Sequence, residues 1–190
     1  VDDAAQQWLS TALQRVGDEI ERQRNQADTL LQAALPDGIR LSPDLGGDQD
    51  RLAARFLSAV QMHPNDRARI SYVNTKGQWL SVVRLGAAEA ALEVRHGPEE
   101  PTIRHLLRPI DGTSVPGAAD AAASGTPGAG PDPREQVWAR HALRSLSAGW
   151  SPIEVDSNSA TLTLSRARPV KDADGQVAGR PEALKYAPAL

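Results

Sequence analysis

The sequence contains no cysteine among its 190 residues, which excludes disulfide bonds, thiolate catalysis and cysteine-ligated zinc or iron–sulfur centres. Large aromatic side chains are scarce, with one phenylalanine, two tyrosines and four tryptophans. A hydrophobic core must therefore consist mainly of Leu, Val, Ile and Ala. No run of 18 or more apolar residues occurs, so we expect any membrane-spanning helix to lie outside this sequence.

The charge balance is nearly even, with 21 basic and 24 acidic residues and a formal net charge of -3. This balance provides neither the basic patch typical of nucleic-acid binding nor a polybasic surface for anionic lipid. The four histidines lack metal-ligand spacing, and the sequence contains no phosphate loop. We therefore expect no cofactor, no nucleic-acid partner and no catalytic activity in this chain.

A long amphipathic helix is predicted at the N-terminus, over residues 1–36, where Pro36 and Gly38 end it. Helices longer than a small globule needs usually pack along a domain, mediate a dimer, or both. Polar residues at Gln23 and Arg24 argue against an uninterrupted coiled coil. The apolar positions, spaced mostly by three or four residues, are Leu9, Leu13, Val16, Ile20, Ala27, Leu30 and Ala34.

The residue patterns after position 48 predict several strands and two shorter helices. Residues 69–74 and 78–84 alternate and flank a Thr-Lys-Gly turn, which is typical of a β-hairpin. Asp132 and Pro133 have the residue types preferred at a helix N-cap and first helical position. The other expected elements are a helix at 49–62, strands at 90–95 and 102–110, a helix ending near 146, strands at 151–155 and 160–170, and a short segment at 176–178.

Strands joined by short turns, with helices gathered to one side, indicate an α+β fold with an antiparallel sheet of PAS-like topology. We divide the chain into the long helix at 1–36 and a PAS-like domain at 37–190. Residues 112–131 are mostly Gly, Ala, Ser, Pro and Thr, which bury little apolar surface. We expect a mobile loop there.

Three segments carry motifs in one order along the chain. Residues 70–77 form a strand that ends in an Asn-x-x-Gly turn, and residues 132–138 read Asp-Pro-Arg-Glu-Gln-Val-Trp. Residues 164–179 contain a strand, Pro-Val, an Asp-x-Asp-Gly turn and Gln-Val-Ala-Gly. Together these segments resemble the Cache family of extracytoplasmic sensor domains, and they cover most of the chain in the family's order.

The resemblance implies a periplasmic sensor domain that lies between two membrane helices of an inner-membrane signalling protein. A small-molecule ligand in a pocket on one face of the sheet would shift the helices. The cytoplasmic output would be a histidine kinase, a cyclic-nucleotide enzyme such as a diguanylate cyclase, or a chemoreceptor module. Such signalling requires that the ligand interact differently with two conformations.

The chain departs from the family pattern at positions that hold amino-acid ligands. Gln136 and Ala139 stand where the amino-acid-binding members have Arg and Tyr beside the helix Trp. The acidic residue of the last strand is missing, and residues 180–186 replace a Val-rich strand. We therefore do not expect amino-acid recognition by that motif. We expect the last strand to be truncated, altered or supplied by another segment.

Seven residues are candidates for lining the ligand pocket. Trp138 lies on the helix face expected to cover the sheet, and Tyr72 and Trp79 occupy inward positions of the strand alternation. Guanidinium groups hold carboxylates through two hydrogen bonds, so the expected ligand is a carboxylate or a similar small anion. For each residue the simpler alternative is core packing, a salt bridge or solvent exposure. The candidates are Tyr72, Trp79, Arg84, Arg134, Trp138, Arg166 and Arg168.

Two other functions remain open at this stage. The long helix would make the chain a homodimerisation or protein-interaction module if no small molecule binds. A periplasmic hydrolase is the third candidate, and it requires a nucleophile and a base within hydrogen-bonding reach. A sensor should have a cavity beside Trp138, whereas an interaction module should have a filled core and an apolar stripe on the outer side of the first helix.

Overall fold

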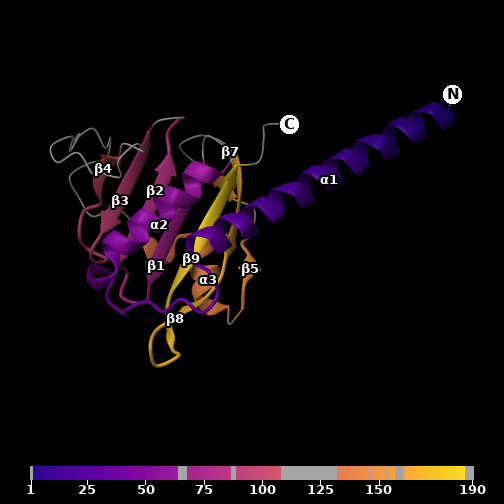
Figure 1. Cartoon of the computed structure of the whole chain (residues 1–190). Coiled ribbons are helices and arrows are strands. Elements are labelled where there is room, and N and C mark those ends of the chain that lie inside the picture. Colours follow the sequence, from indigo (N-terminus) through magenta and orange to yellow (C-terminus); the bar gives the residue numbers. More distant parts are fainter. Residues whose placement is uncertain are drawn as a thin grey trace.

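The chain folds as an antiparallel sheet with helices on both faces and a long N-terminal helix that extends away from it (Figure 1). This arrangement confirms the expected α+β class. In the part of the chain described below, no helix is both long and apolar enough to cross a membrane. The loop expected at 112–131 lies outside the described residues. The computed structural model of the chain describes residues 2–63, 68–86, 89–107, 132–145, 147–152, 154–156 and 161–186.

Helix α1 (Asp2–Ala34) packs against the sheet only with its C-terminal half. Ala27, Leu30 and Ala34 are buried there, whereas the N-terminal half projects away from the sheet (Figure 1). The helix ends before Pro36, because a residue that precedes proline is disfavoured in helical conformation. Four exposed aliphatic residues of the projecting half share one side of the helix and form what we call the exposed stripe, which consists of Leu9, Leu13, Val16 and Ile20.

Helix α2 (Gln49–Met62) lies beside the C-terminal half of α1 and covers β2. Its buried side chains include Leu52, Phe56 and Val60, which recur every four residues and so share one face of the helix. A 3-10 turn, η1 (Leu45–Gly47), precedes α2. The two helices predicted at residues 1–36 and 49–62 are therefore present as α1 and α2.

The strands form one antiparallel sheet in the order β4-β3-β2-β1-β9-β7-β5, with β6 paired to β7 and β8 paired to β9. The last strand in the sequence lies beside the first, so the two ends of the sheet-forming chain meet at the centre of the sheet. The strands are β1 (Arg69–Asn74), β2 (Trp79–Arg84), β3 (Ala90–Arg95), β4 (Ile103–Leu107), β5 (Gly149–Trp150), β6 (Glu154–Asp156), β7 (Thr161–Ala167), β8 (Val170–Lys171) and β9 (Val177–Tyr186).

The hairpin of β1 and β2 forms as predicted, and Asn74 closes its turn. The Asn74 Oδ1 accepts hydrogen bonds from the backbone nitrogens of Lys76 and Gln78 at 3.0 and 2.9 Å. Its Nδ2 donates to the Pro43 carbonyl at 3.1 Å, which joins the hairpin to the segment before η1. Gly77 has a φ of 77°, a left-handed conformation that glycine adopts without strain. Local turn chemistry therefore fixes the register of the hairpin.

The last strand is complete, which corrects the expectation of a truncated or altered end. β9 pairs with β1 on one side and with β7 and β8 on the other. Pro181 explains the difference, because proline lacks an N–H donor and is rare in central strands. Its carbonyl accepts a hydrogen bond from the Arg168 backbone at 3.3 Å, so its nitrogen also faces the interruption between β7 and β8. The strand carries one acidic residue, Glu182.

The two faces of the sheet pack against different helices. Ile70 and Tyr72 point to the side covered by α1 and α2 and belong to the larger hydrophobic core. Val73, the next residue of β1, points to the other side, where it packs with Trp79 and Trp138. The helix that carries Trp138 therefore lies opposite the first two helices. This arrangement differs from the expectation that all helices gather to one side.

Candidate ligand-binding face

Helix α3 (Val137–Arg144) covers the second face of the sheet, over β7 and β9. It follows a 3-10 turn, η2 (Pro133–Glu135), whose backbone donors are capped by Asp132. The sequence predicted one continuous helix from this cap, whereas the α-helix begins only at Val137, because Gln136 has an extended ψ of 142°. Asp132 Oδ1 accepts from the Arg134 backbone at 2.9 Å, and Oδ2 accepts from the Arg134 guanidinium at 2.5 Å. The guanidinium contact lowers the pKa of Asp132 below its usual 3.8. Arg134 also donates to the Thr75 carbonyl at 3.2 Å, so it connects η2 to the first hairpin.

Trp79 and Trp138 form the apolar part of this face. Both are buried in a small cluster with Val73 and Ala167. The Trp138 Nε1 donates to Gln136 Oε1 at 2.7 Å, which orients the ring. The Trp79 Nε1 has no hydrogen-bond partner within the described ranges, so one buried donor is left for another group. The structure thus brings two of the seven candidates together between α3 and the sheet.

A row of polar side chains crosses the same face, one from each of five neighbouring strands. Cross-strand partners point to the same side of a sheet, so the register places the five side chains in one line. Arg69 and Arg180 stand in the adjoining rows on that side. Buried sheet faces are usually apolar, so this composition makes the surface a candidate binding site. The row, which together with Arg69 and Arg180 we call the polar face, consists of Glu182, Ser71, Ser81, Glu93 and Arg104.

One end of the polar face is paired internally and reaches solvent. Ser71 Oγ lies 3.1 Å from Ser81 Oγ at the centre of the row. Arg69 Nη2 donates to Glu93 Oε2 at 3.2 Å, and Arg104 Nε lies 3.9 Å from Glu93 Oε1. The side chains of Glu93, Arg69 and Arg104 are 15%, 29% and 37% exposed. The face therefore opens to solvent around Arg69 and Arg104.

The other end of the polar face is closed by α3. Arg180 and Glu182 on β9 are each only 2% exposed. Arg180 Nη2 donates to the carbonyl of Ser145, the residue that ends α3. Its Nε and Nη1 have no hydrogen-bond partner in the part of the chain that the structure describes. Desolvation on burial lowers the pKa of the Arg180 guanidinium below its ordinary value, because burial penalises the charged form.

Sequence reasoning missed all seven residues of the polar face. A signal was present, because Arg69, Ser71 and Ser81 are polar residues at alternate positions of the two hairpin strands. The same alternation is typical of a strand whose polar side faces water. Helix α3, from a distant part of the sequence, packs over β7 and β9 and buries Arg180, and local alternation does not show such long-range packing.

Arg84 points away from the polar face and holds the end of α2. It shares a side of β2 with Val82, which lies in the core under α1 and α2. Its Nη1 donates to the carbonyls of His63 and Gln61 at 2.7 and 3.4 Å, and its Nε donates to Gly86 at 3.0 Å. The last carbonyls of a helix have no partner within the helix. The structure therefore gives Arg84 a helix-capping contact.

Arg166 and Arg168 point towards α1, on the opposite side of the sheet from α3. Arg166 Nε donates to Asp28 Oδ1 at 2.6 Å, and its Cζ lies 5.6 Å from the centre of the Trp150 ring. Arg168 Nη1 donates to Asp37 Oδ1 at 2.9 Å. These ion pairs tie α1 and the residues after it to β7. Neither arginine contributes to the polar face.

Tyr72 and Trp79 lie on opposite faces of the sheet, although both were expected to reach one pocket. Tyr72 is paired with Leu80 across the hairpin, whereas Trp79 is paired with Val73. The Tyr72 ring lies in the larger core, where its Oη has no hydrogen-bond partner among the residues described. Both positions are inward because helices cover both faces. The alternation of apolar and polar residues along the strands therefore did not show which face of the sheet each side chain occupies.

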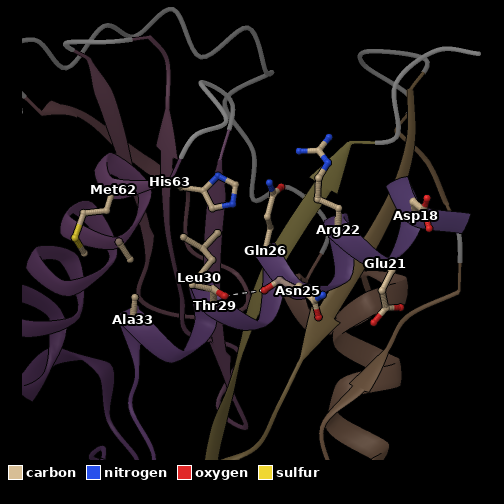
Figure 2. Close-up of a pocket in the computed structure, with 11 residues that line it drawn as sticks. Asp18, Glu21, Arg22, Asn25, Gln26, Thr29, Leu30, Ala33, Met62 and His63 are labelled. Atoms are coloured by element: carbon tan, nitrogen blue, oxygen red, sulfur yellow. Dashed lines mark hydrogen bonds between the residues drawn. The ribbon is translucent and has the colours of Figure 1, made fainter. Parts of the chain in front are cut away.

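A concave surface also occurs where α1 meets α2 (Figure 2). This groove has a volume of about 540 Å³ and lies between residues 18–33 of α1 and the end of α2, at Met62 and His63. Asp18 and Arg22 on its wall are exposed. A small molecule there would keep much of its surface in water, unlike ligands in enclosed sites. The groove is therefore an open surface rather than an enclosed site.

Comparisons with known proteins identify the fold. No protein-family model and no curated protein matches the sequence. Two structures of the sensory domain of the Campylobacter jejuni chemoreceptor Tlp3 are similar, with TM-scores of 0.55 and 0.56 at 12% and 13% identity. The match covers 94% of this chain and 55% and 57% of those chains. The ligand-binding domain of the Pseudomonas aeruginosa chemoreceptor PctC gives a TM-score of 0.46 at 16% identity, covering 94% of this chain and 58% of that one.

This chain spans a little over half of the length of the Tlp3 structures. The aligned part includes nearly all of the chain, so the likeness extends to α1 as well as to the sheet. The order of elements agrees with the topology that the three sequence segments implied. The chain has the Cache-type α+β fold of chemoreceptor sensory domains.

Proposed function

We propose that this chain is the extracytoplasmic small-ligand sensor domain of a transmembrane signalling protein, and that its ligand binds on the polar face. The observation that carries the proposal is the row of charged and hydroxyl side chains on one face of the sheet, which is buried from Glu182 to Ser81 and partly exposed at Glu93 and Arg104. Burying such groups costs stability unless they are paired. Polar groups beside aromatic side chains are typical of sites that bind small molecules, and the two tryptophans lie next to this row. The proposal assigns no catalytic step to this chain.

The shared fold supports the same proposal. The Tlp3 ligand-binding domain was crystallised in complex with 4-methylisoleucine, a small molecule with a carboxylate and an amine. By analogy this chain would take a small carboxylate at an equivalent depth in the fold. The parent protein would be anchored in the inner membrane with this domain in the periplasm. Its output would be a histidine kinase, a cyclic-nucleotide enzyme or a chemoreceptor module.

β9 provides the mechanical connection between the polar face and α1. One side of β9 carries Arg180 and Glu182, and the other side places Ala183 in the core that α1 helps to form. The Arg166–Asp28 ion pair joins α1 to β7, the neighbour of β9. A ligand that shifts β9 would therefore shift α1. The shift requires a ligand that binds one of two conformations more tightly.

A thermal-shift screen of the chain against organic acids, amines, sugars and nucleobases tests the proposal. A ligand at 100-fold excess over its Kd adds about 2.7 kcal/mol to the free energy of unfolding. We expect such a hit to disappear in Ser81→Val, which places a methyl group at the centre of the polar face. Ser58→Val is the matched control, because Ser58 is exposed on α2. No hit across the panel, or a hit that Ser81→Val leaves unchanged, would reject the proposal.

A second candidate function is homodimerisation through α1. The exposed stripe follows the same spacing as Ala27, Leu30 and Ala34, which are buried against the sheet. The projecting half of α1 therefore presents an apolar surface that the described part of the chain does not cover. A second copy of α1 would cover it by the same pattern, with Gln23 as a polar interruption.

Sedimentation velocity over a concentration series tests this second candidate. We expect Leu13→Glu to shift the chain to the monomer, because it places a charge in the exposed stripe. Thr11→Glu is the control, since Thr11 lies on the other side of α1 and its side chain bonds only to the helix backbone. A wild-type chain that sediments as a monomer throughout would exclude homodimerisation.

A further inference from the structure

We propose that Arg180 binds the carboxylate of the ligand on the polar face. The inference rests on the proposed sensor function and adds to it the ligand's charge and its anchoring residue. Arg180 was not among the arginines predicted from the sequence. Two of those, Arg84 and Arg168, are engaged in contacts on the opposite side of the sheet.

The donor geometry of Arg180 suits a carboxylate. A guanidinium group has five N–H donors. The Ser145 carbonyl accepts from Nη2, and neither Nε nor Nη1 has a partner within the described ranges. Because Nη2 carries two hydrogens, one complete two-donor edge of the guanidinium remains available. A carboxylate accepts two parallel hydrogen bonds from such an edge.

The charge of Arg180 also requires a partner. Arg69 is paired with Glu93 on the same face, and Arg134 is paired with Asp132. None of the ion pairs found in the described ranges includes Arg180, although its side chain is the most voluminous of those almost completely buried. A buried cation without a counter-ion destabilises a protein. An anionic ligand would supply the missing charge.

The other unpartnered atoms of this surface are also mostly donors. Arg69 Nε, Arg104 Nε and Trp79 Nε1 are buried and have no hydrogen-bond partner in the described chain. Trp79 stands in the same cross-strand row as Arg180, with Val73 between them. A ligand that reaches from Arg180 towards Trp79 therefore meets a further donor and must bring hydrogen-bond acceptors. A carboxylate brings both the acceptors and the negative charge.

The test uses three carboxylates, each paired with its uncharged amide of the same carbon skeleton: acetate, butyrate and isovalerate. Thermal shift and titration calorimetry measure their binding to the wild-type chain, with chloride and sulfate as inorganic anions. We expect at least one carboxylate to bind and its amide to bind at least tenfold more weakly. Arg180→Met should weaken the carboxylate by about 10- to 100-fold and leave the amide unchanged. Arg168→Met is the matched control, because Arg168 points towards α1.

A stability readout separates binding from a structural role. Without ligand, Arg180→Met should raise the midpoint of thermal unfolding by ~2 °C or more, because it removes a buried unpaired charge. Arg180→Lys keeps the charge but loses the two-donor edge, so it should bind the carboxylate more weakly than wild type. The inference is overturned if Arg180→Met lowers the unfolding midpoint or if both variants bind the carboxylate as wild type does. It is also overturned if only sulfate or chloride binds through Arg180.

The two proposals fail in distinguishable ways. Binding of an amine, a sugar or a nucleobase that Ser81→Val abolishes and Arg180→Met does not affect would retain the sensor and overturn the role of Arg180. The absence of any binding in the wild-type chain would reject both.

Discussion

Gly179 lies directly against the Tyr72 ring, on the α1 side of the sheet. A Cβ atom added at residue 179 would lie 2.4 Å from Tyr72 Oη and 2.5 Å from its Cζ. Gly179 and Asn74 are register partners, and Tyr72 is paired with Pro181, so the ring leans along β1 over the glycine. The close approach explains why the residue before Arg180 in β9 lacks a side chain.

Gly179→Ala should destabilise the chain by at least ~1–3 kcal/mol, because the methyl group would overlap a buried aromatic ring that has no room to move. Urea unfolding followed by circular dichroism measures the loss. Gly17→Ala is the control, since a Cβ there meets no atom within 4 Å and alanine favours the helix. Tyr72→Val should recover part of the loss in the double variant. A purely additive double variant would show that the ring is not the cause.

Tyr72→Phe should leave the free energy of unfolding unchanged or raise it by up to ~1 kcal/mol near neutral pH. The hydroxyl is buried without a partner among the described residues, so its removal sacrifices no hydrogen bond. Burial also raises the pKa of Tyr72 above its ordinary 10.0. Because the folded state holds the Tyr72 proton more tightly than the unfolded state, this group stabilises the fold fully below pH 10.0. The wild type should therefore lose stability as the pH rises above 10.0, and Tyr72→Phe should not lose this contribution. Equal losses in both proteins would contradict this assignment.

Asp132→Asn should change the acid sensitivity of the chain. The pKa of Asp132 is lowered by its hydrogen bond from Arg134, so the ionised carboxylate stabilises the folded state above pH 3.8. That stabilisation is lost as the pH falls through the lower folded-state value. Asparagine still caps the turn but cannot form the ion pair. The stability difference between wild type and Asp132→Asn should therefore shrink below pH 3.8, and a difference that stays constant would contradict the linkage.

Arg84→Ala should loosen the end of α2 and leave ligand binding unchanged. The variant removes the donors to the His63 and Gln61 carbonyls, which should cost about 1–3 kcal/mol. Hydrogen exchange should accelerate in the last turn of α2. Arg55→Ala is the control, because Arg55 is exposed on the same helix. A loss of carboxylate affinity in a folded Arg84→Ala protein would contradict this assignment and indicate that Arg84 contributes to ligand binding.

Local patterns determined several elements from the sequence alone. The spacing of Leu9 to Ala34 predicted α1, and the Asn74–Gly77 turn predicted the first hairpin. Asp132 and Pro133 predicted a helical start at this point, but the structure forms only the turn η2 there and begins α3 at Val137. Each of these signals depends on residues within one or two turns of chain, where backbone geometry and capping contacts act directly. The three segments that resemble Cache domains likewise predicted the fold.

Only the tertiary structure decided which polar residues share a buried surface. Arg180 follows Gly179 and precedes Pro181, a local sequence that argues against a central strand. The interruption between β7 and β8 accommodates the proline, and β1 provides the partner that makes the strand central. The burial of Arg180 depends on α3, which comes from another part of the chain and whose final carbonyl, at Ser145, accepts a hydrogen bond from Arg180. Burial is a property of such long-range packing, so the sequence determined the elements and the tertiary structure determined the candidate site.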